Sequence, residues 1–113
     1  MLLLSLIITS VLALQPMYST VVRDLMTTQQ SPPWVTIQDA VLRDNLAFTS
    51  ADKQHIYVDF SRFRDAPHTL KSVIKHEIAH TLNHQHHDGS AYMQYHATVD
   101  QAGNVVNDAS VLP

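Results

Sequence analysis

The apolar positions of the chain fall into separate groups that predict different elements. The first group is the uncharged run of thirteen residues LLLSLIITSVLAL, at positions 2–14. A run of this length is too short to cross a bilayer as a helix, and it is typical of the apolar segment of a secretory signal. We therefore expect a signal peptide over residues 1–13, with cleavage before Leu14 or as late as Ser19, and a secreted protein without stable membrane insertion. The alternative is an uncleaved apolar helix that retains the chain.

Two helices are expected in the next part of the chain. Apolar residues recur there at helical spacing, at Val21, Val22, Leu25 and Met26. This pattern predicts a short helix that ends in the polar stretch TTQQSPP. A second helix is expected over about residues 37–46, because Thr36 and Asp39 resemble a capping box and a narrow apolar stripe begins at Ile37.

Two strands are expected next, one near Leu46 and Phe48 and one over residues 55–60, joined by a polar turn at residues 51–54. Apolar and polar residues alternate along the second strand. One of its faces should therefore be buried and the other exposed, which is typical of an edge or near-edge strand.

A further helix is expected to begin between Pro67 and Thr69, with His68 or Thr69 at its cap. Its apolar stripe consists of Leu70, Val73, Ile74, Ile78 and Leu82. Together these elements predict an α+β fold, in which a small mixed sheet of two to four strands packs on one or two helices. We expect a single domain over residues 20–113.

Composition and charge narrow the classes of function. A chain of 113 residues with 45% apolar residues is suited to one small globular domain. The absence of cysteine excludes disulfides and thiolate metal sites. Residues 1–76 hold seven Lys and Arg against six Asp, a net charge of +1, whereas residues 77–113 hold four acidic residues and no Lys or Arg, a net charge of −4. No basic patch for nucleic acid is present, and the acidic C-terminal part mildly favours cationic stretches of a partner.

The densest chemistry lies in residues 76–86, which read HEIAHTLNHQH. His76 and His80 are four residues apart, so a helix would place both imidazoles on one face, where they can bind a single ion. Glu77 is the only glutamate in the chain, and it falls between these two histidines. Since no cysteine is present, any metal here must be held by histidine or carboxylate.

The pattern H-E-x-x-H-x-x-N-x-x-H resembles the signature of the metzincin clan of zinc peptidases, with Asn83 in place of a glycine. The resemblance implies that His76, His80 and His86 bind Zn²⁺, and that Glu77 is the general base and acid of a zinc-dependent endopeptidase. The glycine of the clan ends the helix in a left-handed conformation. Asparagine is the non-glycine residue that tolerates this conformation best, so we expect Asn83 to adopt it.

The resemblance extends downstream of the histidines. Met93 follows His86 by seven residues, and the resemblance implies a methionine turn that forms an apolar base under the metal. Tyr95 matches the M-x-Y ending of some families of the clan, in which the phenol approaches the zinc. The closest likeness is to an abbreviated matrixin-like or astacin-like domain with a short irregular C-terminal subdomain. Its partner would be an extended peptide or protein substrate that adds to the edge strand above the cleft.

Other clans of zinc peptidases use a different third ligand. Gluzincins use a downstream glutamate, which this chain lacks after Glu77. Aspzincins use an aspartate, for which Asp88 or Asp100 are candidates, although His86 is preferred. His84, His87 and His96 are interpreted as neighbours or weak additional metal contacts. Because the scaffold is short, the alternative function is a zinc-binding structural or interaction module without catalysis.

Overall fold

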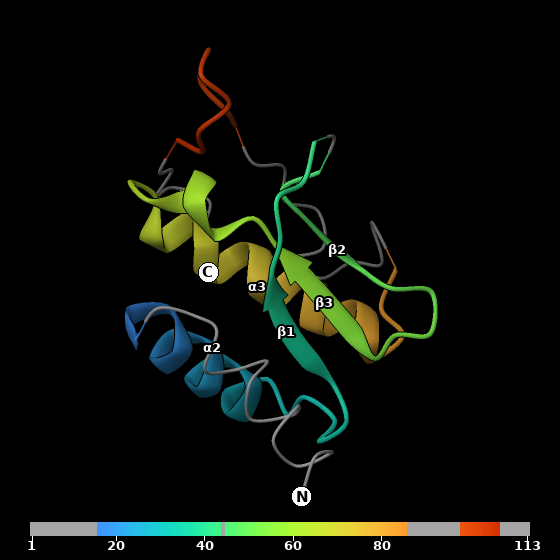
Figure 1. Ribbon diagram of the computed structural model, residues 1–113. Helices are drawn as coiled ribbons and strands as arrows, with labels where there is room; N and C mark the ends of the chain where they lie inside the picture. The colour runs from blue at the N-terminus through green and yellow to red at the C-terminus, as the bar shows by residue number, and fades with distance from the viewer. Residues whose placement is uncertain (1–15, 44, 86–97, 107–113) are drawn as a thin grey trace, which may run out of the picture.

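A three-stranded sheet and two α-helices form the part of the chain that the computed structural model describes, which comprises residues 16–43, 45–85 and 98–106 (Figure 1). The helices are α2 (Pro16–Thr28) and α3 (Pro67–Thr81), with a short 3-10 helix η1 (Phe60–Phe63) before α3. The strands are β1 (Thr36–Asp39), β2 (Ala47–Thr49) and β3 (His55–Val58). The α+β class and the mixed sheet are thus as expected. The predicted leader lies outside the described residues, among which no helix is long and apolar enough to cross a membrane.

The strand order is β1-β3-β2, with β1 parallel and β2 antiparallel to β3. Ile37 lies opposite Ile56 in the parallel pair, and Phe48 lies opposite Tyr57 in the antiparallel pair. Of the two positions expected for the strand after residue 54, edge or near-edge, the edge position was wrong, because β3 is the central strand and lies next to the edge strand β2, which packs on α3. The alternation along β3 has another cause, since the helices cover only one face of the sheet.

The helix expected over residues 37–46 was also wrong. Thr36–Asp39 is strand β1, in which Ile37 is buried between two half-buried neighbours. The Thr36 and Asp39 side chains do not form a capping box. Thr36 Oγ1 lies 3.0 Å from His55 Nδ1, and Asp39 Oδ1 accepts a bond from the Phe60 N–H. Parallel pairing with β3 supplies the backbone hydrogen bonds that a short helix would otherwise have formed, so tertiary pairing outweighs a weak local preference.

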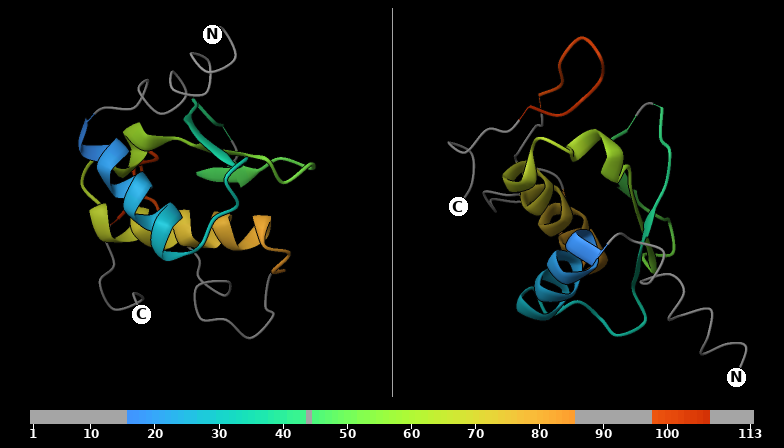
Figure 2. Two further views of the ribbon diagram at one scale, coloured as in Figure 1. Left: turned by 90° about the horizontal axis from the view of Figure 1, so that it is seen from below. Right: turned by 60° about the vertical axis from the view of Figure 1, so that its left-hand side comes forward.

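The core lies between the sheet and the two helices, which pack against each other on one side of the sheet (Figures 1 and 2). Its largest fully buried apolar side chains are Phe60, Phe63, Ile37, Ile56, Ile74, Ile78, Val22 and Val58. They come from α2, α3, η1 and the strands β1 and β3. This arrangement fixes the face of α3 that points away from the core and toward β2.

Helix α2 confirms the first predicted helix. It begins at Pro16, five residues before Val21, the first residue of the apolar pattern. It ends in a Schellman motif, with Gln30 at φ 55° and the Ser31 N–H bonded to the Met26 carbonyl at 2.8 Å. Helix α3 begins at Pro67 with Ala66 as the N-cap residue, so neither His68 nor Thr69 caps it. Proline suits the first helical turn because the missing N–H would have no partner there.

The apolar stripe of α3 is as predicted for Leu70, Val73, Ile74 and Ile78, which are buried. Leu82 was misassigned, because α3 ends at Thr81 and Leu82 is 39% exposed. Of the expected irregular C-terminal subdomain, residues 98–106 are described. They form a bridge between Val99 and Val105, and the Arg62 carbonyl accepts the Val105 N–H at 2.8 Å.

Candidate metal centre

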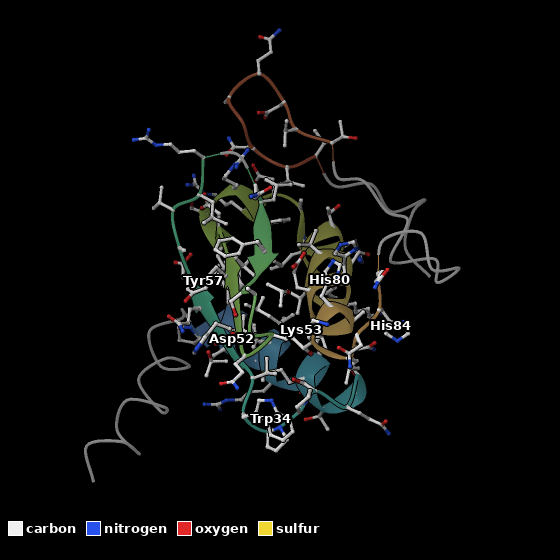
Figure 3. The ribbon with its side chains drawn as sticks, turned by 90° about the vertical axis from the view of Figure 1, so that its right-hand side faces the viewer. Trp34, Asp52, Lys53, Tyr57, His80 and His84 are labelled. Carbon is white, nitrogen blue, oxygen red and sulfur yellow. The ribbon has the colours of Figure 1, made fainter. Side chains whose placement is uncertain are left out.

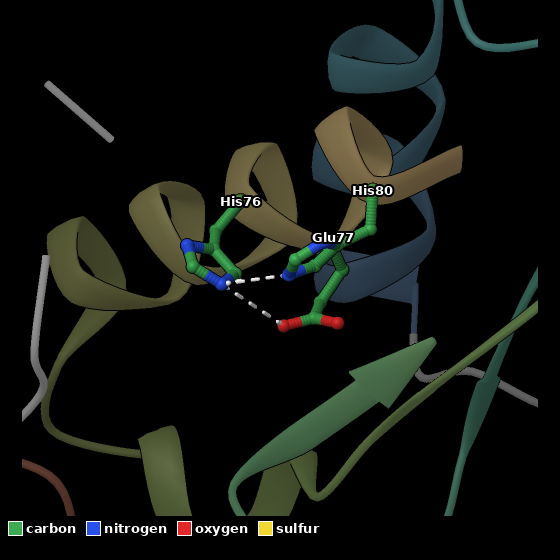
Figure 4. A group of neighbouring side chains, drawn as sticks. All are labelled: His76, Glu77 and His80. Atoms are coloured by element: carbon green, nitrogen blue, oxygen red, sulfur yellow. Dashed lines mark hydrogen bonds and ion pairs between the residues drawn. The ribbon is translucent and has the colours of Figure 1, made fainter. Parts of the chain in front are cut away.

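Helix α3 brings three metal-binding side chains together on its cleft face: His76, Glu77 and His80 (Figure 4). The ligand atoms of the three residues all lie within 4.8 Å of one another. The spacing of one helical turn places the two imidazoles side by side, with Nε2 of His76 3.1 Å from Nε2 of His80. This group could hold a metal ion.

The two imidazole nitrogens of the histidine pair are close enough to bind one metal ion. Two nitrogens, each about 2.0–2.1 Å from a tetrahedral zinc ion, are about 3.3 Å apart. The Nε2 to Nε2 distance of 3.1 Å is close to that separation. The rings meet edge to face, with an interplanar angle of 81° and centroids 4.7 Å apart, so both Nε2 atoms point into the same space.

The Nδ1 atom of His80 is 3.1 Å from the carbonyl oxygen of His84. A carbonyl can only accept, so His80 carries its proton on Nδ1 when this bond forms. The lone pair of neutral His80 is then on Nε2, which faces His76. A backbone carbonyl that fixes the tautomer in this way is the usual support of a metal-binding histidine. His84 thus contributes through its backbone, a role that its side chain gave no reason to expect.

Glu77 is 6% exposed and is the acidic member of the group. Burial raises the pKa of its carboxyl above the ordinary value, although the hydrogen bond from Thr49 and the nearby His76 each act to lower the pKa. The Thr49 hydroxyl lies 2.9 Å from Glu77 Oε1 and 3.1 Å from the Glu77 carbonyl oxygen. The other carboxylate oxygen, Oε2, is 3.9 Å from His76 Nε2. Thr49 therefore fixes one oxygen and leaves the other on the histidine side.

A cavity of about 430 Å³ opens beside this group. Its lining comes from the β2 side through Asn45, residues 47–51 and Lys53, and from α3 through His76, Glu77 and His80. Since β2 pairs with β3 on one side only, its other edge borders the cavity among the residues that the structure describes. The candidate centre is thus one wall of a cleft, and the edge of a strand is the other.

Asn83 has φ 70°, so the expected left-handed residue is confirmed. The Asn83 N–H bonds to the His80 carbonyl at 3.1 Å, and the His84 N–H bonds to the Ala79 carbonyl at 3.0 Å. These two bonds form a Schellman motif. The motif ends α3 directly after the second histidine and also presents the His84 carbonyl to the His80 ring.

This conformation predicts opposite outcomes for two substitutions at one position. Asn83→Ala should destabilise the protein by about 1 kcal/mol, because alanine is strained at positive φ. Asn83→Gly should be neutral or slightly stabilising, although both variants lose the same amide side chain. Chemical denaturation of the two variants measures the difference, and equal stabilities would contradict the role assigned to the backbone conformation.

Three residues of the predicted site, His86, Met93 and Tyr95, lie outside the described residues, as do His87, His96 and Asp88. The alternative ligand Asp100 is described. Its Oδ1 accepts the N–H groups of Ala102 and Asn104, both at 2.9 Å. Within the described residues, the group that could hold a metal does not include Asp100.

Two residues of the cleft were not anticipated from the sequence, Thr49 and Lys53. Both come from the β2 side of the cleft. Thr49 bonds to Glu77, 28 residues further along the chain, and Lys53 bonds to Asn83, 30 residues further along. A threonine at a strand end and a lysine in a polar turn carry no sequence signal of their own. The chain matches no protein-family model, no curated protein and no solved structure.

Proposed function

We propose that the protein is a zinc-dependent endopeptidase of metzincin type, in which His76, His80 and His86 bind zinc and Glu77 is the general base and acid. Met93 would support the site from below, and Tyr95 would approach the metal or the oxyanion. The observation that carries the proposal is the position of Glu77. Its carboxylate lies within 4.8 Å of the ligand nitrogens of His76 and His80, in a cleft whose opposite wall is the edge of β2.

In this proposal an extended peptide pairs with the free edge of β2 and presents a carbonyl to the centre. Zinc bound there would lower the pKa of a water and polarise that carbonyl. Glu77 Oε2, on the histidine side, accepts the proton of the water and then transfers it to the leaving amine. Thr49 holds Oε1 throughout, so the carboxylate keeps the orientation that proton transfer requires.

Secretion is part of the same proposal and depends on the apolar leader. Cleavage after residue 13 would leave α2 complete, whereas cleavage near Ser19 would remove its first turn. The alternative, retention by an uncleaved N-terminal helix, would leave the cleft chemistry unchanged. Identification of the N-terminal residue of the protein recovered from culture medium distinguishes the two.

The function is tested by incubating the zinc-loaded protein with casein and with a mixture of unstructured peptides. We expect internal peptide bonds to be cut, and we expect a chelator to stop the reaction and added zinc to restore it. The rival function is a zinc-binding module without catalysis, which the small three-stranded sheet favours. Stoichiometric zinc without any cleavage would support the module and contradict the peptidase.

The Thr49 hydrogen bond predicts a change in the pH dependence of cleavage. Removal of this bond in Thr49→Val should raise the pKa of Glu77 further, because the bond favours the ionised carboxyl. Since the base form of Glu77 is the active one, the acidic limb of the pH–rate profile should move to higher pH. Thr49→Ser keeps the hydroxyl and is the matched control. An unchanged acidic limb in Thr49→Val would show that this bond does not tune the base.

A further inference from the structure

Lys53 lies at one end of the cleft and links its two walls. The Lys53 ammonium donates a hydrogen bond of 2.6 Å to Oδ1 of Asn83 and so joins the β2–β3 turn to the end of α3. Lys53 is labelled in Figure 3, together with His80 of α3. Both bonded residues have a left-handed backbone conformation, with φ 61° at Lys53 and φ 70° at Asn83. The Lys53 N–H also bonds to the Ser50 carbonyl at 2.9 Å, so the lysine projects from a fixed turn.

The positive charge of Lys53 is not neutralised in the described structure. Its bonded partner Asn83 is a neutral amide, and among the described residues no carboxylate lies within ion-pair distance of it. The adjacent Asp52 is directed into the turn, where its Oδ1 accepts the Ser50 hydroxyl and the Gln54 N–H. These bonds keep the pKa of Asp52 below its ordinary value, the Ser50 bond most strongly.

Lys53 is also the only lysine or arginine among the described residues that line the cleft. A lysine ammonium has three donors, and the bond to Asn83 uses one of them. The remaining donors are available to a ligand that lies along β2 and extends beyond Thr49. Among the described lining residues, Lys53 lies at one end of the cleft and the carboxyl group of Glu77 belongs to the candidate metal centre, so a preference for anions is expected only at the Lys53 end.

We propose that Lys53, positioned by Asn83, is a specificity-determining residue that binds a carboxylate of the substrate within a few residues of the cleaved bond. The inference rests on the proposed function and specifies its substrate class. A carboxylate accepts charge-assisted hydrogen bonds from an ammonium group, whereas an amide at the same place is bound more weakly and a cation is repelled. The carboxylate can belong to an Asp or Glu side chain or to the C-terminus of a short peptide, since the two have the same chemistry.

The test measures binding separately from cleavage. Zinc-loaded Glu77→Gln protein is titrated into fluorescein-labelled alanine-based peptides that carry Glu, Gln or Lys at one scanned position. A second set compares a free C-terminal acid with a C-terminal amide. At one position, or at the C-terminus, we expect the acid to bind about tenfold more tightly than the amide, the effect of one charge-assisted bond.

Substitutions then assign the preference to Lys53. Lys53→Met should abolish the preference, and Lys53→Glu should reverse it in favour of the Lys peptide. The matched control is Lys71→Glu, an exposed lysine of α3 that lines a separate groove beside α2 and should keep the preference. Circular dichroism checks that each variant is folded. A preference that persists in Lys53→Glu, or that is absent with Lys53 present, would overturn the inference.

The result is distinguishable from that of the proposed function. If the unsubstituted protein cuts peptides without regard to carboxylates, the peptidase proposal holds and the role of Lys53 is wrong. If binding depends on Lys53 but no peptide is cut, the carboxylate site holds and the peptidase proposal fails. Comparison of kcat and KM for matched Glu and Gln peptides adds a further check, because a binding contact of this kind should mainly change KM.

Discussion

Glu77→Gln is expected to lower the rate of peptide hydrolysis by about 10²–10⁴-fold, the usual contribution of a general acid–base residue. Glutamine has nearly the same shape and can still accept the Thr49 hydrogen bond, but it cannot take a proton from water at neutral pH. Zinc binding should persist, because His76 and His80 keep their facing nitrogens. The measurement is single-turnover or steady-state cleavage of one peptide, with zinc content determined on the same sample.

The same variant should be more stable than the unsubstituted protein when metal is absent. Burial raises the pKa of Glu77 in the folded state above its ordinary value of 4.5, so at neutral pH folding places a charge in an unfavourable environment. Removing this charge should therefore raise the Tm of the metal-free protein at neutral pH. The difference should vanish as the pH falls below 4.5, where the carboxyl is neutral in both the folded and the unfolded states.

Two outcomes would contradict the assignment of Glu77. Full activity in Glu77→Gln would show that another group is the base. A lower Tm of the metal-free variant at neutral pH would show that the ionised carboxylate stabilises the fold instead of costing free energy. Asp65→Asn is a suitable control for charge removal, because Asp65 is exposed and is not among the residues that line the cleft.

His80→Ala is expected to weaken zinc binding by more than about 100-fold. Loss of an outer-sphere partner alone typically weakens a metal site by about 10–100-fold, and His80 would supply a direct ligand. In the unsubstituted protein zinc should raise the Tm in proportion to the logarithm of its concentration, because it binds the folded state only. This rise should be absent in His80→Ala.

His55→Ala is the matched control for His80→Ala. His55 lies on β3 beside Thr36 and outside the cleft lining, so its loss should not change the zinc-dependent rise in Tm. Isothermal titration in competition with a chelator of known affinity gives the zinc affinity of each variant. Zinc bound to His80→Ala with unchanged stoichiometry and affinity would exclude His80 as a ligand.

The local features of the site helix were determined by the sequence alone. The stripe of Leu70 and Ile74 and the placement of His76 and His80 on one face follow from the helical period, which neighbouring residues set between themselves. The left-handed end at Asn83 follows in the same way, because asparagine tolerates positive φ and the motif needs a sharp stop. These features depend on contacts within one or two turns of the chain.

Other features were decided only by tertiary structure. Residues 36–39 form a strand and not a helix because they pair with β3. The paired residues are far apart in the sequence, for example nineteen residues for Thr36 and His55. The central place of β3, and the position of β2 beside α3, also depend on strand order, which no local pattern encodes.

Glu77 shows most clearly which features follow from the local sequence and which follow from tertiary structure. The sequence placed the carboxylate between two histidines, but its burial and its bond to Thr49 arise only when β2 packs against α3. The link from Lys53 to Asn83 arises in the same way, through a turn that approaches the end of the helix. The histidine pair that could hold a metal ion therefore depends on one helix, whereas the cleft beside it depends on the packing of β2 against α3.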